Sequence, residues 1–286
     1  MQKTLKVQEI IWKKKAIRAF ISKYKVMSRI FKRNHMKFRN NKIITPTKEM
    51  VHIIKQGGIF MAKIIVFNND SDRMETYYRE ENQAMPYNTN RTLTVREFRG
   101  SSNSPTLWTT KRTMQTWNSF RYLYGSSIPV GFAFKRPWEG GHGNQSQHYA
   151  GVAFDVGQRL TNAERNRMRN LAISSDMWSY VEPAYLTPTW VHFDKRFGSP
   201  ACGTAGYPLL RQRSISNYVL IAQDDLNTLG FRTGGLDGIF GTQTKNAVTS
   251  YQRSRGLSAD GIVGCNTWRS LQEDVVGTGR TSPTID

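Results

Sequence analysis

The chain has 286 residues, of which 41 are Lys or Arg and 21 are Asp or Glu, so its formal net charge is +20. A hydrophobic content of 38% with 12% aromatic residues is enough for a packed core, which excludes a wholly disordered chain. No run of about 18 apolar residues is present, so the sequence predicts no membrane-spanning helix.

The positive charge is concentrated in the first 60 residues, which hold 16 basic residues against Glu9 and Glu49, a net charge of +14. Such a segment is compatible with a nucleic-acid arm, a membrane-surface helix or a processed leader, although no secretory signal is recognisable. However, codons compatible with Lys55 to Phe60 contain AAGGAGG, a bacterial ribosome-binding sequence, shortly before the ATG of Met61. We therefore expect residues 1–60 to be translated upstream DNA or a disordered segment.

The remaining residues, 61–286, carry a net charge of only +6 and begin with a β-rich run at 64–67. A polar stretch to about residue 104 predicts strands and loops. Apolar residues then recur near helical spacing, which predicts a helix over 106–124 that ends at Gly125.

The next predicted elements are a strand at 149–156, a helix that starts at Thr161 and a strand at 190–194. Thr161 and Glu164 have the spacing of a capping box, and the helix extends to about residue 174. Because helices and strands intermix, the first unit, residues 61–197, is expected to have an α+β fold.

A Gly- and Pro-rich linker is expected at 198–212, followed by a second unit at 213–275 and a tail at 276–286. The second unit repeats a five-residue pattern, DGIFG at 237–241 and DGIVG at 260–264, with Thr244 and Thr267 seven residues after each Asp. Helices are expected over 218–229, from a cap at Thr242 to Gly256, and after the second repeat.

This segment, from Ser216 to Leu271, is similar to the three-helix peptidoglycan-binding modules of bacterial cell-wall hydrolases. The resemblance rests on two similar turns and their helices, which recur in the same order. Asp237 and Asp260 look like residues that form the turns rather than residues that contact a sugar. The resemblance implies that bacterial peptidoglycan is the binding partner.

The first unit contains SQHYAGVAFD at 146–155, which resembles the SxHxxGxAxD signature of zinc D-alanyl-D-alanine peptidases, whose fold is shared with the hedgehog signalling domain. WVHFD at 190–194 resembles the strand that supplies their last ligand. The resemblance implies that His148, Asp155 and His192 bind zinc (Zn2+). Two imidazoles and one carboxylate leave a fourth position open for water, whose pKa a bound zinc lowers to about 7.

Two further residues compete for a place at this site. His142 is the main rival ligand, but the glycines on both sides of it suit a mobile loop better. Asp194 is expected on the same strand face as His192, where it would orient a histidine rather than bind the metal.

The general base and the anion-binding group are harder to assign. Relatives often place a Glu or His shortly before the last ligand, whereas Thr187, Pro188 and Thr189 stand there in this chain. Glu182 is the nearest upstream carboxylate and is therefore the candidate base, with a solvated loop residue as the alternative. Arg136 is the candidate for binding the substrate carboxylate or the developing oxyanion, or it is a surface charge.

The sequence therefore predicts a zinc peptidase, a D,D-carboxypeptidase or an endopeptidase, that hydrolyses amide bonds in cell-wall peptides and acts at the bacterial cell wall. We expect a monomer with no nucleic-acid partner; a phage lysin and a spore-stage enzyme are both compatible with the missing signal. The alternative is a noncatalytic wall-binding protein with a degenerate zinc site. Cys202 and Cys265 could pair across the linker or remain free thiols.

Overall fold

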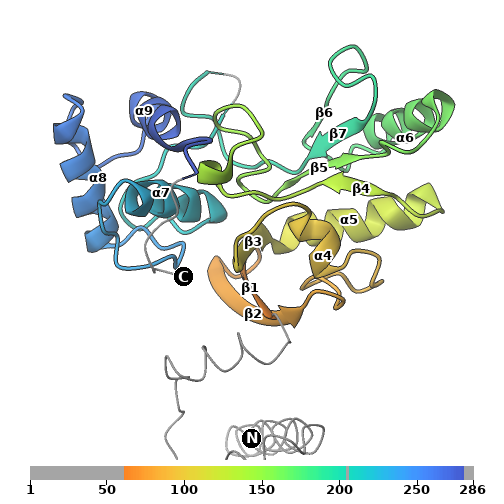
Figure 1. Cartoon of the computed structure of the whole chain (residues 1–286), viewed down its shortest axis with the longest axis horizontal. Coiled ribbons are helices and arrows are strands. Elements are labelled where there is room, and N and C mark those ends of the chain that lie inside the picture. Colours follow the sequence, from red (N-terminus) through yellow and green to blue (C-terminus); the bar gives the residue numbers. More distant parts are fainter. Residues whose placement is uncertain (1–60, 204–205, 280–286) are drawn as a thin grey trace, which may run out of the picture. The chain divides into compact units, whose positions relative to one another are not determined.

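The structure, a computed structural model, describes residues 61–203 and 206–279, which belong to one compact unit (Figure 1). The basic segment and the proposed initiator context of Met61 lie outside the described residues. Within the described residues, no helix is both long and apolar enough to cross a membrane. The described part has an α+β fold, with mixed sheets in its N-terminal part and three helices in its C-terminal part.

The first sheet has three strands in the order β2-β1-β3. The strand β1 (Met61–Asn68) pairs antiparallel with β2 (Arg73–Glu80) and parallel with β3 (Thr106–Thr110). A short helix, α4 (Val95–Arg99), lies between β2 and β3 and begins with a capping box of Thr94 and Glu97. The sequence predicted the strand at 64–67, but it did not predict this helix.

The predicted helix over 106–124 was wrong in its first five residues. Thr106–Thr110 forms the buried strand β3, and the helix α5 begins only at Lys111 and ends at Tyr124. β-branched threonines favour the extended backbone, and pairing with β1 supplies partners for it. The predicted end is confirmed, since Gly125 adopts the left-handed conformation with φ of 78°.

The second sheet has four antiparallel strands in the order β4-β5-β7-β6: β4 (Val130–Phe132), β5 (Ala153–Val156), β7 (Val191–Asp194) and β6 (Tyr180–Val181). The helix α6 (Asn162–Ser174) packs on β6 and β7, and its predicted capping box of Thr161 and Glu164 is confirmed. The strand expected over 149–156 is shorter than predicted, because residues 149–151 form a turn.

The C-terminal part contains the three helices that the sequence predicted: α7 (Asn217–Thr228), α8 (Thr242–Ser254) and α9 (Cys265–Val275) (Figure 1). The predicted cap at Thr242 was wrong by one residue. Gly241 is the N-cap and Thr242 is the first helical residue.

The two DGIxG repeats form matching turns, each organised by a buried glutamine. In the first repeat, Gln223 donates to Asp237 Oδ1 at 2.7 Å and accepts from the amide of Gly238 at 2.9 Å. In the second, Gln252 donates to Asp260 Oδ1 at 3.0 Å and accepts from the amide of Gly261 at 2.9 Å.

Each aspartate also accepts a hydrogen bond from the amide two residues later, and each glutamine contacts the repeated threonine, Thr244 or Thr267. The aspartates are therefore turn-forming residues, as the sequence suggested.

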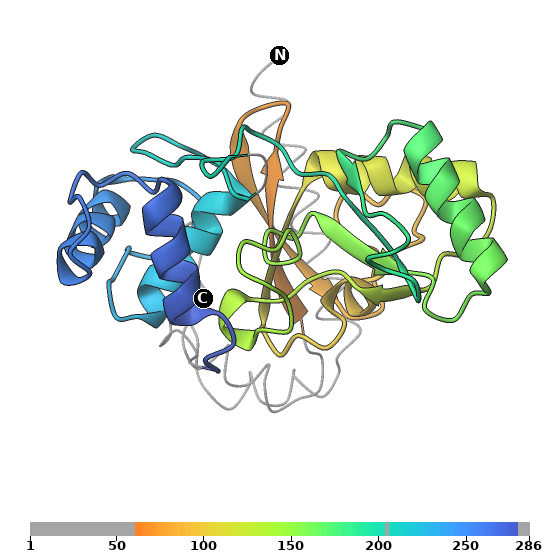
Figure 2. The same cartoon turned by 90° about the horizontal axis from the view of Figure 1, so that it is seen from above.

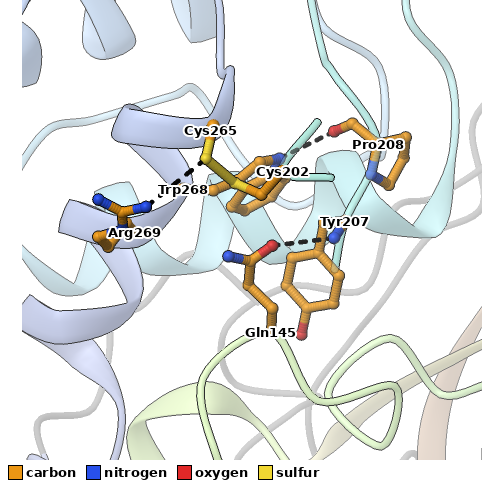
Figure 3. The surroundings of a disulfide bond; sticks show 7 residues. All are labelled: Gln145, Cys202, Tyr207, Pro208, Cys265, Trp268 and Arg269. Atoms are coloured by element: carbon orange, nitrogen blue, oxygen red, sulfur yellow. Dashed lines mark hydrogen bonds between the residues drawn. A yellow bond between two sulfur atoms is a disulfide. The ribbon is translucent and has the colours of Figure 1, made fainter. Parts of the chain in front are cut away.

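Cys202 and Cys265 form a disulfide that attaches the segment after β7 to the first residue of α9 (Figure 3). The same segment forms isolated antiparallel β-bridges, one between Pro200 and Pro208 and one between Leu210 and Val263. The indole of Trp268 donates to the carbonyl of Pro208 at 2.8 Å. These bonds fix the described part of the predicted linker against the C-terminal helices.

One continuous hydrophobic core extends through both parts of the described chain. It includes Trp108 and Phe154 from the sheets and Tyr218 and Trp268 from the C-terminal helices, all of them fully buried. The helix α7 also packs on β3 and on the 3₁₀ turn η1 (Pro137–Glu139), which α9 contacts as well. Figure 2 shows α7 and α9 beside the loop between β4 and β5.

Candidate metal centre

The second sheet brings Asp155 and His192 together across neighbouring strands. Asp155 on β5 is the register partner of His192 on β7, so both side chains point to the same face of the sheet. The carboxylate oxygen Asp155 Oδ1 lies 2.7 Å from His192 Nδ1. Two of the three predicted zinc ligands therefore meet through strand pairing.

The other two histidines of the described residues, His142 and His148, lie on the loop between β4 and β5. The Nδ1 atom of His148 lies 3.1 Å from the carbonyl oxygen of Ala133, a contact that assigns the proton to Nδ1 and directs Nε2 toward Asp155. Gly151 permits the turn that follows, since it has a φ of 68° and a Cβ there would lie 1.9 Å from the carbonyl oxygen of Trp108.

His142 joins the cluster that His148 and Asp155 form. Its ring stacks on that of His148, with centroids 4.1 Å apart, and Phe132 packs against both rings. Donor atoms of His142, His148 and Asp155 all lie within 4.8 Å of one another, whereas His192 is not part of that group. The glycine-flanked residue that sequence reasoning set aside is thus close enough to be a ligand.

The chemistry of this cluster fits a metal ion. The Nε2 atoms of His142 and His148 are buried and have no hydrogen-bond partner among the residues that the structure describes. Although His148 Nε2 lies 3.3 Å from Asp155 Oδ1, that contact lacks the geometry of a hydrogen bond. Buried polar atoms without partners are rare in folded proteins, and two imidazole nitrogens beside a carboxylate are ligands that suit zinc.

Burial and neighbouring charges shift the pKa values of His142, Asp155 and His192 away from their ordinary values. Burial, together with the neighbouring His148, lowers the pKa of His142 to about 3, which keeps the ring neutral and able to bind a metal. Burial alone would raise the pKa of Asp155, but the hydrogen bond with His192 and the proximity of the His148 ring hold it below its usual range. Burial would lower the pKa of His192, but hydrogen bonds to Asp155 and Asp194 raise it to about 9.

Asp194 lies where the sequence placed it, on the same strand face as His192. Its Oδ2 atom is 3.4 Å from His192 Nε2, and its Oδ1 atom accepts from the Nε of Arg196 at 2.7 Å. The carboxylate is fully buried, so Arg196 compensates its charge while Asp194 orients the imidazole.

Glu182 follows β6, and its amide donates to the carbonyl of His192 at 2.9 Å. The register of β6 and β7, with Tyr180 opposite Asp194, places Glu182 opposite His192 and thus on the same face of the sheet. Its role as a base stays a prediction.

The loop from Glu182 to Trp190 is held by Arg169, a buried residue of α6. Its guanidinium donates to the carbonyls of Glu182, Thr187 and Trp190 at 3.1, 2.8 and 2.7 Å. Thr187, at one of the positions where the sequence resemblance leads us to expect a base, also accepts through its hydroxyl at 3.1 Å. Thr187 therefore helps to hold the loop that precedes β7, the strand that carries His192.

Arg136 has partners outside the histidine cluster. Its guanidinium forms a buried ion pair with Asp224 of α7, with Nε 2.7 Å from Asp224 Oδ2, and Nη1 donates to Ser104 Oγ at 2.9 Å. The side chain is 1% exposed and packs on the rings of Trp108 and Trp138. These contacts engage the guanidinium in the protein interior, and an anion-binding role of Arg136 stays a prediction.

Tyr149 is the site residue that sequence reasoning missed. Its hydroxyl accepts from the amide of His142 at 3.2 Å and donates to the carbonyl of the same residue at 2.8 Å. It therefore holds the backbone of His142 from inside the signature. Its position next to His148 in the SxHxxGxAxD pattern could have indicated a role at the site. Only the folded loop, however, shows that its hydroxyl contacts the backbone of His142.

The comparison with family models identifies the C-terminal part. Residues 216–271 match the family model described as a peptidoglycan binding domain, PG_binding_1. This match covers α7, both DGIxG turns, α8 and most of α9. The C-terminal part is thus a peptidoglycan-binding domain, as the sequence resemblance implied, and this implies association with the cell wall.

Individual relatives match shorter parts of the chain. The "N-acetylmuramoyl-L-alanine amidase CwlM" of Mycobacterium tuberculosis is 58% identical over 53 residues, which are 18% of this chain and 13% of that protein. An "Uncharacterized protein in bpoA1 3'region" of Kitasatospora aureofaciens is 38% identical over 76 residues, 26% of this chain and 64% of that protein. The chain thus spans less than two thirds of either curated relative.

A solved structure is also similar in part. It is a peptidoglycan-binding protein from Clostridioides difficile, in a complex with glutamine hydroxamate, and is 41% identical. The match covers 24% of this chain and 44% of that chain, with a TM-score of 0.24.

Proposed function

We propose that the protein is a zinc-dependent peptidase that hydrolyses amide bonds in the peptides of bacterial peptidoglycan. The observation that carries the proposal is the pair of unpartnered, buried imidazole nitrogens beside Asp155 in a chain that also has a peptidoglycan-binding domain. Partial similarity to a cell-wall amidase supports a hydrolase acting on the same polymer.

We propose His148 and Asp155 as two of the metal ligands, with His192 as the third, as the sequence resemblance implies. His142 is the alternative third donor, because one of its ring nitrogens lies in the same compact group as donor atoms of His148 and Asp155. A bound zinc ion would act as a Lewis acid on a carbonyl and would lower the pKa of water to about 7. Three protein ligands leave one position open for that chemistry.

Glu182 is the proposed general base. Its position opposite His192 supports this role, because a carboxylate on that face could accept a proton from the attacking water and deliver it to the leaving amine. Asp194 would keep the His192 ring in one orientation through its contact with Nε2.

Digestion of purified peptidoglycan by the zinc-loaded full chain, followed by mass spectrometry of the fragments, tests the proposal. We expect cleavage of an amide bond in the peptides, and the fragment masses identify the bond and separate carboxypeptidase from endopeptidase activity. Asp155→Asn should lose zinc and cleavage while it still sediments with peptidoglycan, because the binding domain is unchanged.

Asp176→Asn is the matched control, since Asp176 is an exposed carboxylate with a φ of 53°, a conformation that Asn also accepts. This variant should keep zinc, cleavage and binding. A wild-type protein that sediments with peptidoglycan but neither binds zinc nor releases fragments would be a noncatalytic wall-binding protein, and the peptidase proposal would be wrong.

A further inference from the structure

The peptidoglycan-binding part contacts the histidine-bearing loop directly, next to His148. The hydroxyl of Tyr218 on α7 donates to Gln147 Oε1 at 2.9 Å. The hydroxyl of Tyr207 donates to the carbonyl of Ser146 at 2.7 Å. Gln147 and both tyrosines are buried, so water cannot replace these donors without a cost. The two residues before the ligand His148 thus depend on donors from the C-terminal half of the chain.

Gln145 extends the same contact by one residue. Its amide donates to Gln272 Oε1 of α9 at 3.0 Å, and its side-chain Oε1 accepts from the amide of Tyr207 at 2.9 Å. Figure 3 shows Gln145 reaching Tyr207 below the disulfide of Cys202 and Cys265. The disulfide joins the segment that contains Tyr207 to the helix that contains Gln272. The two hydrogen-bond partners of Gln145 are therefore covalently linked to each other through this disulfide.

The ends of the loop are held as well. After His148, the side chain of Asn217 donates to the carbonyl of Ala150 at 2.6 Å. Before His142, Arg136 pairs with Asp224, and the amide of Gly277 donates to the carbonyl of Pro137 at 3.1 Å. The C-terminal part therefore contacts the loop before His142, between His142 and His148, and after His148.

We propose that the peptidoglycan-binding domain and its preceding segment position the metal site, with Tyr207 and Tyr218 as the main positioning residues. This inference rests on the proposed function, because it assumes that His148 binds a metal. A domain that acted only as a tether would leave the metal affinity unchanged when its contacts with the loop were removed. Contacts that fix the loop instead reduce its freedom before the ion binds. Direct hydrogen-bond partners of metal ligands typically contribute about 10- to 100-fold in metal affinity, and we expect these contacts with neighbouring residues to lie at the lower end of that range.

The test compares Tyr207→Phe and Tyr218→Phe with a matched control in the full chain. Tyr251→Phe is the control, because its hydroxyl contacts Ser270 and Asp274 at 2.6 Å, both within the C-terminal part. Each variant removes one hydroxyl from a buried tyrosine, but only the first two remove a contact with the loop. Circular dichroism and thermal unfolding of the metal-free proteins establish that each variant is folded.

The readouts are the zinc dissociation constant, from competition with a chromophoric chelator, and the visible spectrum of the cobalt(II) form. We expect Tyr207→Phe and Tyr218→Phe to weaken zinc binding by about tenfold and to change the cobalt spectrum, and Tyr251→Phe to change neither. If the first two folded variants bind zinc as tightly as the wild type, the positioning role is wrong while the metal site stands. If the wild type itself binds no zinc, the metal-site proposal and this inference both fail.

Discussion

Asp155 and His192 face each other across β5 and β7, with Asp155 Oδ1 2.7 Å from His192 Nδ1, while the other ring nitrogen of His192 lies 3.4 Å from Asp194. The imidazole therefore sits between two carboxylates, only one of which also lies beside His142 and His148. Asp155 and His148 are therefore shared by both possible ligand sets, which differ only in His142 or His192 as the third donor.

Single alanine variants identify the third metal donor. We expect His148→Ala and His192→Ala each to weaken zinc binding by roughly a hundredfold or more, because each removes one of the three proposed ligands. His142→Ala should weaken it by less than about tenfold, since it would remove only a neighbour. Zinc titration of the folded proteins measures these effects. The reverse order for His142 and His192 would assign the third donor to His142.

Removal of the Arg169 guanidinium should destabilise the strand that carries His192. Arg169→Met leaves the carbonyls of Glu182, Thr187 and Trp190 without their buried donor, so we expect a loss of about 3 kcal/mol in the free energy of unfolding. Urea unfolding measures this. Arg167→Met, an exposed position on the same helix, should cost less than about 0.5 kcal/mol. Equal losses for the two variants would contradict the structural role of Arg169.

The repeated glutamines predict a specific loss of stability in the C-terminal part. Gln252→Leu leaves the amide of Gly261 and the carbonyl of Ile262 without their partner, so we expect a loss of about 2–3 kcal/mol. Gln243→Leu, at an exposed position of α8, serves as the control and should change stability little. Chemical unfolding monitored by Trp fluorescence provides the comparison, and an unaffected Gln252→Leu protein would argue against the network.

Asp225 should make the protein less stable as the pH rises. Burial raises its pKa well above the ordinary value, and the adjacent Asp224 raises it further, although Gln272 donates to it at 2.6 Å. The folded state therefore binds this proton more tightly than the unfolded state. The resulting stability is fully present below the ordinary pKa of 3.8 and is lost as the pH rises toward the raised value.

Asp225→Asn should remove this dependence and be more stable than the wild type at neutral pH, because the amide carries no charge and its carbonyl oxygen can still accept from Gln272. Unfolding of both proteins between about pH 4 and 8 tests the sign. A stability difference that stays constant over this interval would contradict the predicted ionisation of Asp225.

Signals that act over a few residues were sufficient for several elements of the fold. The Thr161–Glu164 capping box and the stop at Gly125 were predicted from spacing alone, since a cap depends on side chain and backbone atoms within one turn. The DGIxG repeat predicted the helical domain, and the comparison with family models confirmed it. Such features need no distant partner, so the local sequence contains their physical cause.

Partners distant in sequence determined the rest. Residues 106–110 form a strand because β1 pairs with them, and a helical spacing of apolar residues could not reveal that pairing. Gln252 attracts no attention in the sequence, yet it organises a turn eight residues away through hydrogen bonds.

The sequence by itself was enough to identify the peptidoglycan-binding domain and to predict His148, Asp155 and His192 as metal ligands. Only the tertiary structure decided that His142 joins the cluster, that Arg136 pairs with Asp224, and that Tyr207 and Tyr218 hold the histidine loop. These contacts join residues up to 88 positions apart, and burial makes each of them selective, because a polar group removed from water must find a partner wherever the fold provides one.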